Sequence, residues 1–530
     1  MKKILIALLL GLTAISTNLR AQQHVTLEGI SSRGFSGVQT IDGSFFYTFY
    51  FGEKTENKDM ANFVLQLYDQ DLKSIATKTI EITKFSKLAA SAFNGKYFFF
   101  IFADPNKNTE TFVTIDKQGN LVKQKVNEGV RAALLVPDNY PDVFPESDDD
   151  FLVVTAEKEK KFGYEVERMD KEFNSRWTKS FFPENGSWSI EDAHILNGKL
   201  YILRTEKAHT VGDKYFYTVQ AINADNGEQL YATALNDGDD GGFPGFIRVA
   251  DDGTVAAGGM YFHDGRYSDK NSDGCFFALI SPDGKMKFNK ASWSDVKQRI
   301  KDDYSQNIFA GKTKVLIEDL IHKKDGGYVL VSETFQKGKA SDDHIKISFG
   351  GGIKPSSKEN ELDFSVLDFV LFNFSASGEL TGITKIDKES REAVVKGSMA
   401  GENALTIAEW LGDKRKFFCY KSTVEFNGKQ YILFKNEDGA KMRAYFMPID
   451  GTTTENLPNI DLDKWVSDKL NKWAKLSKAK HTFEYDPMKD EISGETYKNI
   501  IAAKPGFMLL YNFNYKGNMD IWLEPIPTTN

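Results

Sequence analysis

Short apolar runs separated by tight polar turns recur along the whole chain. One unit shows the pattern well: the turn Asn94-Gly95-Lys96, the run Tyr97–Phe102, a loop, the run Thr111–Ile115 and the turn Asp116-Lys117-Gln118-Gly119-Asn120. Such runs predict β-strands, and the Gly-bearing turns predict antiparallel hairpins. Because one hairpin cannot bury its own faces, the repetition predicts a stack of sheets. We identify eight units, whose leading strands begin near Gly43, Gly95, Phe151, Gly198, Gly253, Gly327, Gly428 and Gly506.

A third strand precedes most of these leading strands, and a fourth follows most of the polar turns, as at Lys87–Phe93 and Leu121–Val126. Four antiparallel strands that recur about every 50 residues are typical of a propeller blade. The sequence therefore predicts an all-β fold, an eight-bladed β-propeller, in a single domain that spans residues 22–530.

The last unit lacks a fourth strand, because only a few residues follow the run Asp520–Leu523. A spare strand-like segment, His24–Ile30, lies near the N-terminus. We expect this N-terminal strand to complete the eighth blade and close the ring, since closure removes the exposed edges that an open array would leave.

The long connections fall between the second and third strands of a unit, or between consecutive units. In a propeller these two kinds of connection emerge on the same face, so we expect the insertions to build up one face. Insertions gathered on one face usually mark the binding side of a repeat protein. The largest are 261–274, 292–312, 335–365, 389–415 and 452–495.

Two insertions have apolar residues at the 3.6-residue period of a helix. A short helix is predicted from Trp293, Val296, Ile300 and Tyr304. A longer helix with lysines on its opposite face is predicted from Leu462, Trp465, Val466, Leu470, Trp473 and Leu476. We expect both to pack their apolar faces on the propeller, although a basic helix with two tryptophans could also lie on a membrane.

The first 21 residues have the order of a secretory signal peptide. Lys2 and Lys3 precede the apolar run Ile4–Leu10, and a polar stretch leads to Ala21. The run is too short to span a bilayer, and no later segment is apolar enough to do so. We therefore expect residues 1–21 to be removed and the mature chain to work in the periplasm or outside the cell, without a transmembrane segment.

Charge and cysteine content narrow the set of partners. The formal charge is −8, which becomes −11 when Lys2, Lys3 and Arg20 are removed with the leader. An acidic chain is a poor partner for nucleic acid, so we expect none to bind. Cys275 and Cys419 lie in apolar runs of different units, which predicts two buried thiols, although an exported compartment would permit a disulfide.

The loop 261–274 is the richest in polar chemistry. Its candidate ligand-binding residues, for an acid or a sugar, are Tyr261, His263, Arg266 and Tyr267. Its candidate metal ligands, spaced as in a calcium loop and followed by a Gly, are Asp269, Asn271 and Asp273. Ile280 stands where an EF-hand would have Glu, so any calcium would be held in a loop of another kind. A solvated turn is the structural alternative.

No motif in the chain identifies a catalytic centre. The sequence has no HxH, HxxxH, GxSxG or P-loop pattern and no dinucleotide fingerprint. We expect no cofactor, with calcium as the one candidate. A hydrolase that uses two carboxylates would draw them from 75 acidic residues, among which the sequence singles out no pair.

The sixth unit resembles a known repeat. Its residues Asp325-Gly326-Gly327-Tyr328, followed by the aliphatic run Val329–Val331, are similar to the DGGY-type blade repeats of exported bacterial β-propeller proteins, a family of unknown function. As a pattern the resemblance covers most of residues 22–530, although other units have Asn-Gly-Lys or Asp-Asp-Asp in place of Asp-Gly-Gly. It implies a propeller fold and export, and it carries over no catalytic residue.

These observations favour a non-catalytic binding scaffold that engages a protein partner or a glycan on the face with the long loops. The alternative is a glycan-active enzyme, a lyase or a hydrolase, with a site near the fifth blade. Convergent polar groups around His263 and Arg266 would favour the enzyme, whereas a broad apolar or aromatic patch would favour a partner surface.

Overall fold

The computed structural model describes most of the chain, and strands dominate the described residues. These are residues 24–27, 45–51, 55–130, 141–146, 149–158, 161–207, 215–265, 272–304, 313–340, 361–414, 417–438, 441–462, 481–484, 499–513 and 519–527. In these ranges no helix is both long and apolar enough to cross a membrane. The chain forms two compact units, residues 1–82 with 496–527 (unit 1) and residues 83–495 with 528–530 (unit 2).

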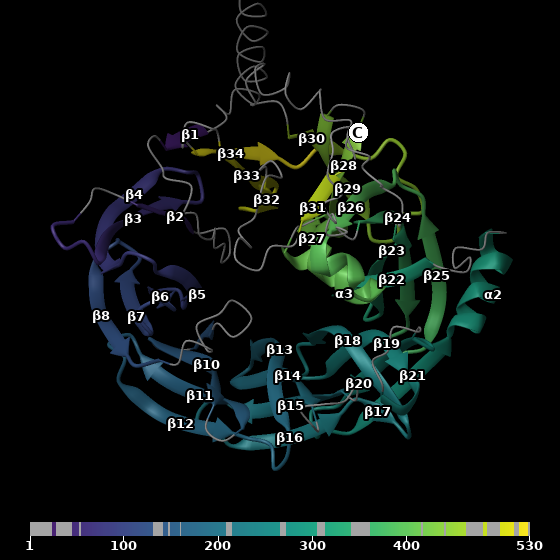
Figure 1. The fold of residues 1–530 in the computed structure, drawn as a ribbon, viewed down its shortest axis with the longest axis horizontal. Helices are drawn as coiled ribbons and strands as arrows, with labels where there is room; N and C mark the ends of the chain where they lie inside the picture. The colour runs from purple at the N-terminus through teal and green to yellow at the C-terminus, as the bar shows by residue number, and fades with distance from the viewer. Residues whose placement is uncertain are drawn as a thin grey trace, which may run out of the picture. The chain divides into compact units, whose positions relative to one another are not determined.

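Unit 2 contains six sheets that follow one another in chain order (Figure 1). The first sheet contains β5 (Lys87–Phe93), β6 (Tyr97–Asp104), β7 (Thr109–Asp116) and β8 (Leu121–Glu128). The second contains β9 (Asp142–Pro145), β10 (Asp150–Lys158), β11 (Phe162–Asp170) and β12 (Ser175–Phe181). The third contains β13 (Ser187–Leu196), β14 (Lys199–Lys207), β15 (Tyr215–Asn223) and β16 (Gln229–Ala234). Each is a set of antiparallel neighbours.

The other three sheets of unit 2 have the same core of antiparallel strands, with additions. The fourth sheet contains β17 (Asn236–Asp237), β18 (Asp240–Val249), β19 (Val255–Phe262), β20 (Gly274–Ile280) and β21 (Met286–Ser292). The fifth contains β22 (Thr313–His322), β23 (Tyr328–Ala340), β24 (Glu361–Phe374) and β25 (Leu380–Ile386), and it is extended by β26 (Arg391–Lys396) and β31 (His481–Glu484). The sixth contains β27 (Tyr420–Phe426), β28 (Lys429–Asp438), β29 (Lys441–Pro448) and β30 (Asn459–Asp461). The strands of both units have a propeller arrangement.

Consecutive sheets of unit 2 share apolar cores, because the middle strands are apolar on both faces. Between the β5–β8 and β9–β12 sheets, the Phe99 and Phe151 rings lie edge to face with centroids 5.2 Å apart. Between the β17–β21 sheet and the β22–β25 strands, the Phe277 and Tyr328 ring centroids are 5.0 Å apart. All four rings are buried. Burying one such side chain contributes about 1.5–3 kcal/mol, so these cores hold the sheets together.

Unit 1 contains two sheets. One has β2 (Phe45–Phe51), β3 (Met60–Asp69) and β4 (Ser74–Thr83), and the other has the order β1 (His24–Leu27), β34 (Met519–Pro525), β33 (Phe507–Phe513) and β32 (Asn499–Ala502). The N-terminal strand therefore joins the C-terminal strands in one sheet, as the sequence predicted. Tyr68 of β3 and Leu509 of β33 belong to one core, which joins the two sheets of unit 1.

The expectation of eight complete blades is wrong for the described residues. Seven of their sheets have four strands or more, whereas the β2–β4 sheet has three. The segment 37–41, which the repeat pattern predicts as the first strand of this unit, lies outside the described residues, and the described part of this sheet has three strands. The signal peptide expected at residues 1–21 also falls outside them.

The first strand lies on the concave side of unit 2 (Figure 1), and in five sheets it has a β-bulge at a corresponding place. In β13 the register shifts between Ile190 and Asp192, and in β22 between Ile317 and Asp319. A bulge bends the strand and re-aims its side chains. The Asp319 carboxylate bonds the side chains of Arg248 in β18 and Tyr420 in β27, so it links three consecutive first strands.

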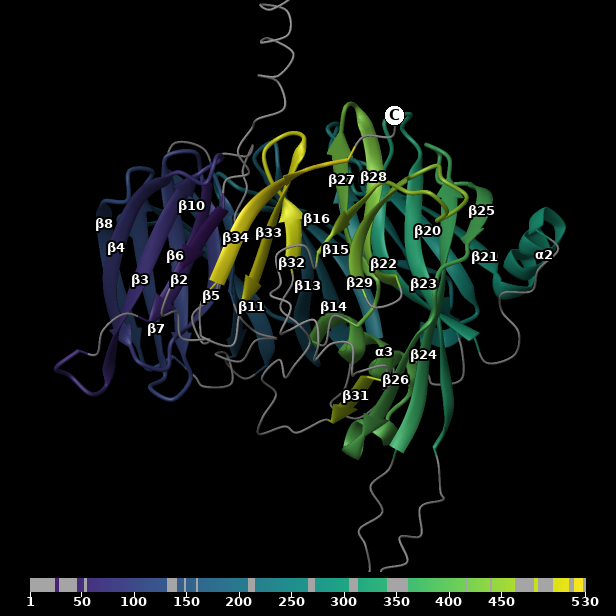
Figure 2. The ribbon, with the colours of Figure 1, turned by 90° about the horizontal axis from the view of Figure 1, so that it is seen from above.

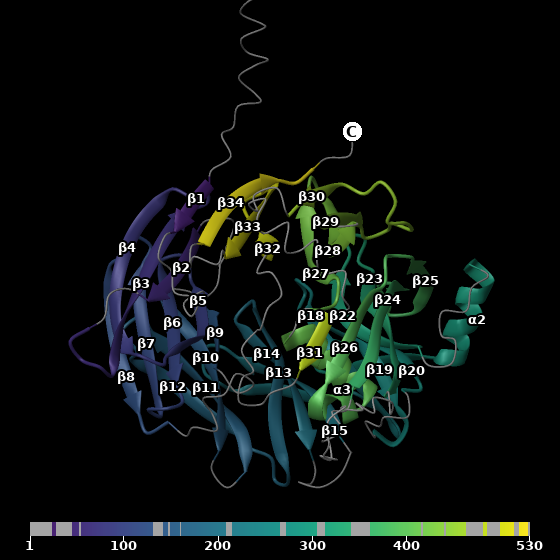
Figure 3. The same ribbon diagram turned by 45° about the horizontal axis from the view of Figure 1, so that its top comes forward.

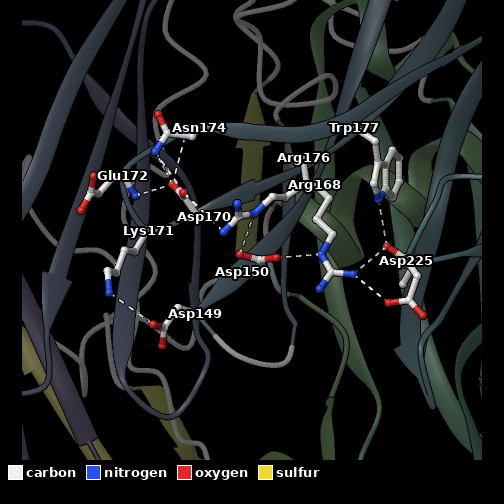
Figure 4. Close-up of polar contacts among 11 residues, drawn as sticks. Asp149, Asp150, Arg168, Asp170, Lys171, Glu172, Asn174, Arg176, Trp177 and Asp225 are labelled. Atoms are coloured by element: carbon white, nitrogen blue, oxygen red, sulfur yellow. Dashed lines mark hydrogen bonds and ion pairs between the residues drawn. The ribbon is translucent and has the colours of Figure 1, made fainter.

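A polar cluster fastens the β9–β12 sheet to the next one (Figure 4). Arg168 of β11 donates from Nε to Asp150 Oδ2 and from Nη1 to Asp225 Oδ1 in the β15–β16 turn, both at 2.9 Å. Trp177 Nε1 donates to the Ala224 carbonyl of the same turn at 3.1 Å. Arg168 and Asp150 are mostly buried, so this ion pair is shielded from water. Arg176 is more exposed and lies 3.6 Å from Asp150.

The helix predicted near Trp293 is present as α2 (Trp293–Tyr304). Its start is capped by Ser292, whose Oγ donates to Asp295 Oδ2 at 2.7 Å and accepts from the Asp295 N–H at 3.2 Å. Val296 is fully buried in the core beside β20 and β22. In Figure 1 the helix lies on the convex side, next to β25. The second predicted helix, apart from Leu462, lies outside the described residues.

Arg168→Met should destabilise the protein by about 3 kcal/mol, because it leaves the buried Asp150 carboxylate without its closest cation. Denaturant titration measures the change. Arg176→Met is the matched control, and it should cost less than about 1 kcal/mol because that pair is longer and more exposed. Equal losses in the two variants would show that the Arg168 ion pair does not fasten the sheets.

Candidate functional site

The loop after β19 contains the residues that the sequence analysis singled out. Tyr261 ends up buried in the core between the β13–β16 and β17–β21 sheets. His263 is exposed and begins a short 3₁₀ helix, η3 (His263–Gly265). Arg266 and Tyr267 lie outside the described residues. Of the four candidate ligand-binding residues, the described part of the chain thus presents only His263 to solvent.

His263 belongs to a chain of ion pairs on the β17–β21 sheet. Its Nδ1 lies 3.0 Å from Asp240 Oδ1, and Lys290 Nζ lies 2.5 Å from Asp240 Oδ2 and 2.9 Å from Asp237 Oδ2. Burial alone would raise the pKa of Asp240, but the hydrogen bonds from Lys290 and His263 bring it below its ordinary value. A carboxylate held ionised by hydrogen bonds from Lys290 and His263 is a weak general acid.

The proposed calcium ligands are only partly within the described residues. Asp269 and Asn271 lie outside them, and Asp273 uses Oδ2 to accept the His263 N–H at 2.8 Å. This bond joins the two described ends of the loop. Within the described ranges, no group of three or more His, Cys, Asp or Glu side chains is placed to hold a metal ion.

Three long connections build one structure, which we call the platform. It consists of the end of β23, the first half of β24, β26, η4 (Gly397–Gly401), α3 (Ala404–Glu409), η5 (Trp410–Lys414) and β31. β26 pairs antiparallel with the first half of β24, and β31 pairs parallel with β26. Figure 2 shows these elements projecting beyond the ends of the other unit 2 strands, and Figure 3 shows them from an oblique angle.

The platform has an apolar core of its own. α3 begins at Asn403, whose side chain accepts the Thr406 N–H at 2.8 Å, and it contributes the fully buried Ile407. Phe243 and Phe262 of the β17–β21 sheet join the same core, so the base of the His263 loop contacts the platform. Its other large members include Phe335, Leu362, Phe364, Val395, Leu411, Phe417 and Phe418.

A buried ion pair anchors the platform to the blade. Glu333 and Lys388 are fully buried, 3.1 Å apart, and Glu333 Oε1 also accepts the Tyr420 N–H at 2.7 Å. Burial would lower the pKa of Lys388, but the Glu333 charge outweighs it and raises the pKa, so the ammonium stays charged. The β23–β24 register shifts directly after Glu333, which is where the shared strands pass from blade to platform.

The cysteines are buried free thiols, as the sequence predicted. Burial raises the pKa of Cys275 to about 12, and it also raises the pKa of Cys419 beside Lys388. A thiol that stays protonated is a poor nucleophile and a poor metal ligand. These two groups therefore serve packing.

The outward face of the platform presents exposed acids. In β24 and β26 buried residues alternate with solvent-facing ones, and Asp363 and Glu392 are exposed on the same face of the two paired strands. They are diagonal neighbours, because Asp363 lies opposite Val394. The most exposed charged side chains that the structure describes on the platform are the acids Asp363, Glu392, Glu402 and Glu409. Lys396 lies on the same face as Glu392, is partly exposed and pairs with Glu361 at 2.5 Å.

A second group of carboxylates lies on the concave side of unit 2. Asp192, in the β13 bulge, accepts the Ile247 N–H of β18 at 3.2 Å and lies 3.1 Å from His194 Nε2. Asp142 of β9 remains accessible to solvent, yet the protein around it displaces enough water to raise its pKa to about 6, and the Asp192 charge adds to this rise. Burial also raises the pKa of Glu191, the residue before Asp192 in the chain. Raised carboxyl pKa values are typical of functional sites.

The sequence analysis named neither group of acids. Asp142 and Asp192 are 50 positions apart and interact electrostatically only because consecutive sheets stack. Asp363 and Glu392 meet only because β24 pairs with β26. One signal was available: Asp363 and Glu392 alternate with apolar residues, which is typical of a half-exposed strand.

Comparison with known proteins identifies a family. The family model described as "Family of unknown function (DUF6770)" matches residues 1–480. No curated protein matches the chain. Among solved structures, a protein of unknown function from Bacteroides caccae is 10% identical, with 69% of this chain and 94% of that chain covered and a TM-score of 0.25. The β-propeller domain of the trilobed protease from Pyrococcus furiosus is 12% identical, with 68% and 98% covered and a TM-score of 0.33.

Asp142→Asn should change how stability depends on pH. Because the folded state keeps the Asp142 proton up to about pH 6, this group stabilises wild type below the ordinary aspartate pKa of about 4. That stabilisation is lost as the pH rises from about 4 to about 6. Over this range the melting temperature of wild type should fall relative to that of Asp142→Asn, and above pH 6 the two curves should run parallel. In Asp192→Asn the pH range over which stability falls should become narrower but remain, because burial contributes more to the raised pKa of Asp142 than the Asp192 charge does. Parallel curves from pH 4 to 7 would contradict a raised pKa.

Proposed function

The chain belongs to the family of unknown function DUF6770, and we propose that it is a non-catalytic scaffold that holds a basic partner protein on the outward face of the platform. The observation that carries this proposal is the convergence of three distant connections on one projecting structure with its own core and an acidic surface. Surfaces built from insertions on one face of a repeat protein are the usual binding side.

The buried aromatic rings support a protein partner over a glycan. Sugar sites commonly present exposed aromatic faces, but the large rings of the platform core are buried, as are Tyr261 and Trp410. The polar groups around His263 are already joined in ion pairs and hydrogen bonds. An acidic surface of this kind favours association with a positively charged surface, mainly by accelerating encounter.

Charge reversal on the platform tests the proposal. Immobilised wild type should retain a protein from envelope extract, where the expected export would bring the two together, and retention should weaken as salt rises. Asp363→Lys with Glu392→Lys should reduce retention of that protein at least tenfold, because the change replaces attraction by repulsion across the interface. The readout is the bound fraction of each retained protein, by quantitative mass spectrometry.

Glu128→Lys on the exposed outer strand β8 is the matched control. It changes the net charge in the same direction, on a surface of unit 2 outside the platform, and it should leave retention unchanged. Retention that survives the platform variant, or falls equally in the control, would overturn the proposal. Circular dichroism of each variant confirms that the fold is kept.

A glycan-active enzyme remains the second candidate, because Asp142 and Asp192 are neighbouring carboxyl groups of which one has a raised pKa. Such a pair is suited to general acid–base chemistry on a glycosidic bond. In this alternative the site would lie at β9 and β13, beside the β18 strand that Asp192 bonds, and the calcium loop at Asp273 would be a supporting element.

A thermal-shift screen of residues 22–530 tests the glycan and calcium readings together. The scaffold proposal predicts no shift with glycans. A glycan that raises the melting temperature of wild type, but not that of Asp142→Asn, would favour the enzyme. A rise in millimolar calcium that is lost in Asp269→Ala with Asp273→Ala would establish the calcium loop, and no rise in wild type would remove it.

A further inference from the structure

The edge of β34 in unit 1 is a binding site for an extended strand. β1 occupies it through four residue pairs, with Val25 opposite Ile521 and Thr26 opposite Asp520. β1 is the last strand of its sheet, so β34 is its one neighbour there. Without β1, the N–H and C=O groups along β34 would form an open edge, which is a ready template for another strand.

Of the β1 side chains, the structure describes that of Val25. Val25 is half-buried and packs against the core that contains Tyr68, Leu509 and Ile521. A net gain of about 0.5–1.5 kcal/mol per hydrogen bond is close to the cost of about 1–2 kcal/mol for ordering each residue. The strand is therefore held largely because it is tethered to its own chain, which gives β1 a high effective concentration at the β34 edge.

The tether does not restrict β1 to its own chain. Seventeen residues, 28–44, separate β1 from β2, and such a segment can span up to roughly 58 Å when extended. The same strand from a second copy would make identical pairs with β34, since every contact is set by this short sequence and its acceptor edge. Exchange of an identical element between copies is a low-cost route to a dimer.

We propose that the β34 edge accepts residues 24–27 of a second copy of this chain, so that the protein forms strand-exchanged dimers. The exchange conserves the four residue pairs between β1 and β34. It is independent of the platform and of the function proposed for it. Its extent rises with protein concentration, because a second copy must compete with the tethered strand.

Disulfide trapping between differently labelled full-length mature chains tests the proposal. One chain carries Thr26→Cys and the other Asp520→Cys, which are directly paired positions. When the two are mixed and oxidised, we expect a disulfide-linked dimer that grows with concentration and exceeds, by roughly tenfold or more, the dimer from Thr26→Cys mixed with Glu524→Cys. The native Cys275 and Cys419 are buried and should not react.

Two further measurements complete the test. The single chain with both Thr26→Cys and Asp520→Cys should form the internal disulfide, which shows that the geometry permits the bond. A peptide of residues 22–30 in excess should reduce the trapped dimer, whereas the same peptide with Val25→Asp should not. If the internal disulfide forms but the mixed chains give no dimer, or no more than the off-register pair, β1 does not exchange and the proposal fails.

Discussion

The apolar contact between neighbouring sheets is the interaction on which the rest of the structure depends. Hydrogen bonds join strands within a sheet, but they do not join one sheet to the next. That connection comes from rings such as Phe99 against Phe151, and Phe277 against Tyr328. Because both faces of a middle strand are covered, strands such as β19 (Val255–Phe262) are apolar almost throughout. The polar fasteners, such as Arg168, lie at the margins of these cores.

The platform follows from the same constraint. β23 and β24 continue beyond the blade, so their far halves need a new apolar partner, which β26 and α3 supply. The passage from blade to platform is marked by a register shift and by the buried pair Glu333–Lys388. A charge pair that is fully buried is costly to form and more costly to break on one side. The Glu333–Lys388 pair therefore determines the junction of the blade core and the platform core more specifically than additional apolar contacts would.

The strands could be predicted from the sequence because the information for them is local. Apolar runs and Gly-bearing turns located most of the hairpins, and the incomplete last unit led to the pairing of His24–Leu27 with β34. The number of complete blades could not be predicted, since the strand count of a sheet depends on pairing between separate segments, and the described β2–β4 sheet has three strands. The propeller arrangement itself follows from the repeat.

The candidate site was harder to predict, for two physical reasons. In a blade buried on both faces the period-two alternation is lost, so nothing near Tyr261 distinguished a core ring from a ligand-facing one. The acids that matter meet across sheets or across an added strand, as Asp142 meets Asp192 and Asp363 meets Glu392. Those pairings depend on how the sheets stack and how the insertions fold, and no short segment of sequence contains that information.

The recurring bulge in the first strands adds one residue to the concave wall in each of five sheets. Corresponding bulge positions hold Ala89, Glu191, Gly245, Glu318 and Lys421, a set with no shared size or charge, while the strands that follow them stay apolar. At Gly245 the packing between sheets limits the choice of residue, because an added Cβ would lie 2.9 Å from Ile317 in the next sheet. Each bulge therefore adds one residue to its first strand beyond the register of the neighbouring strand, and the identity of that residue differs from sheet to sheet while the same hairpin pattern repeats.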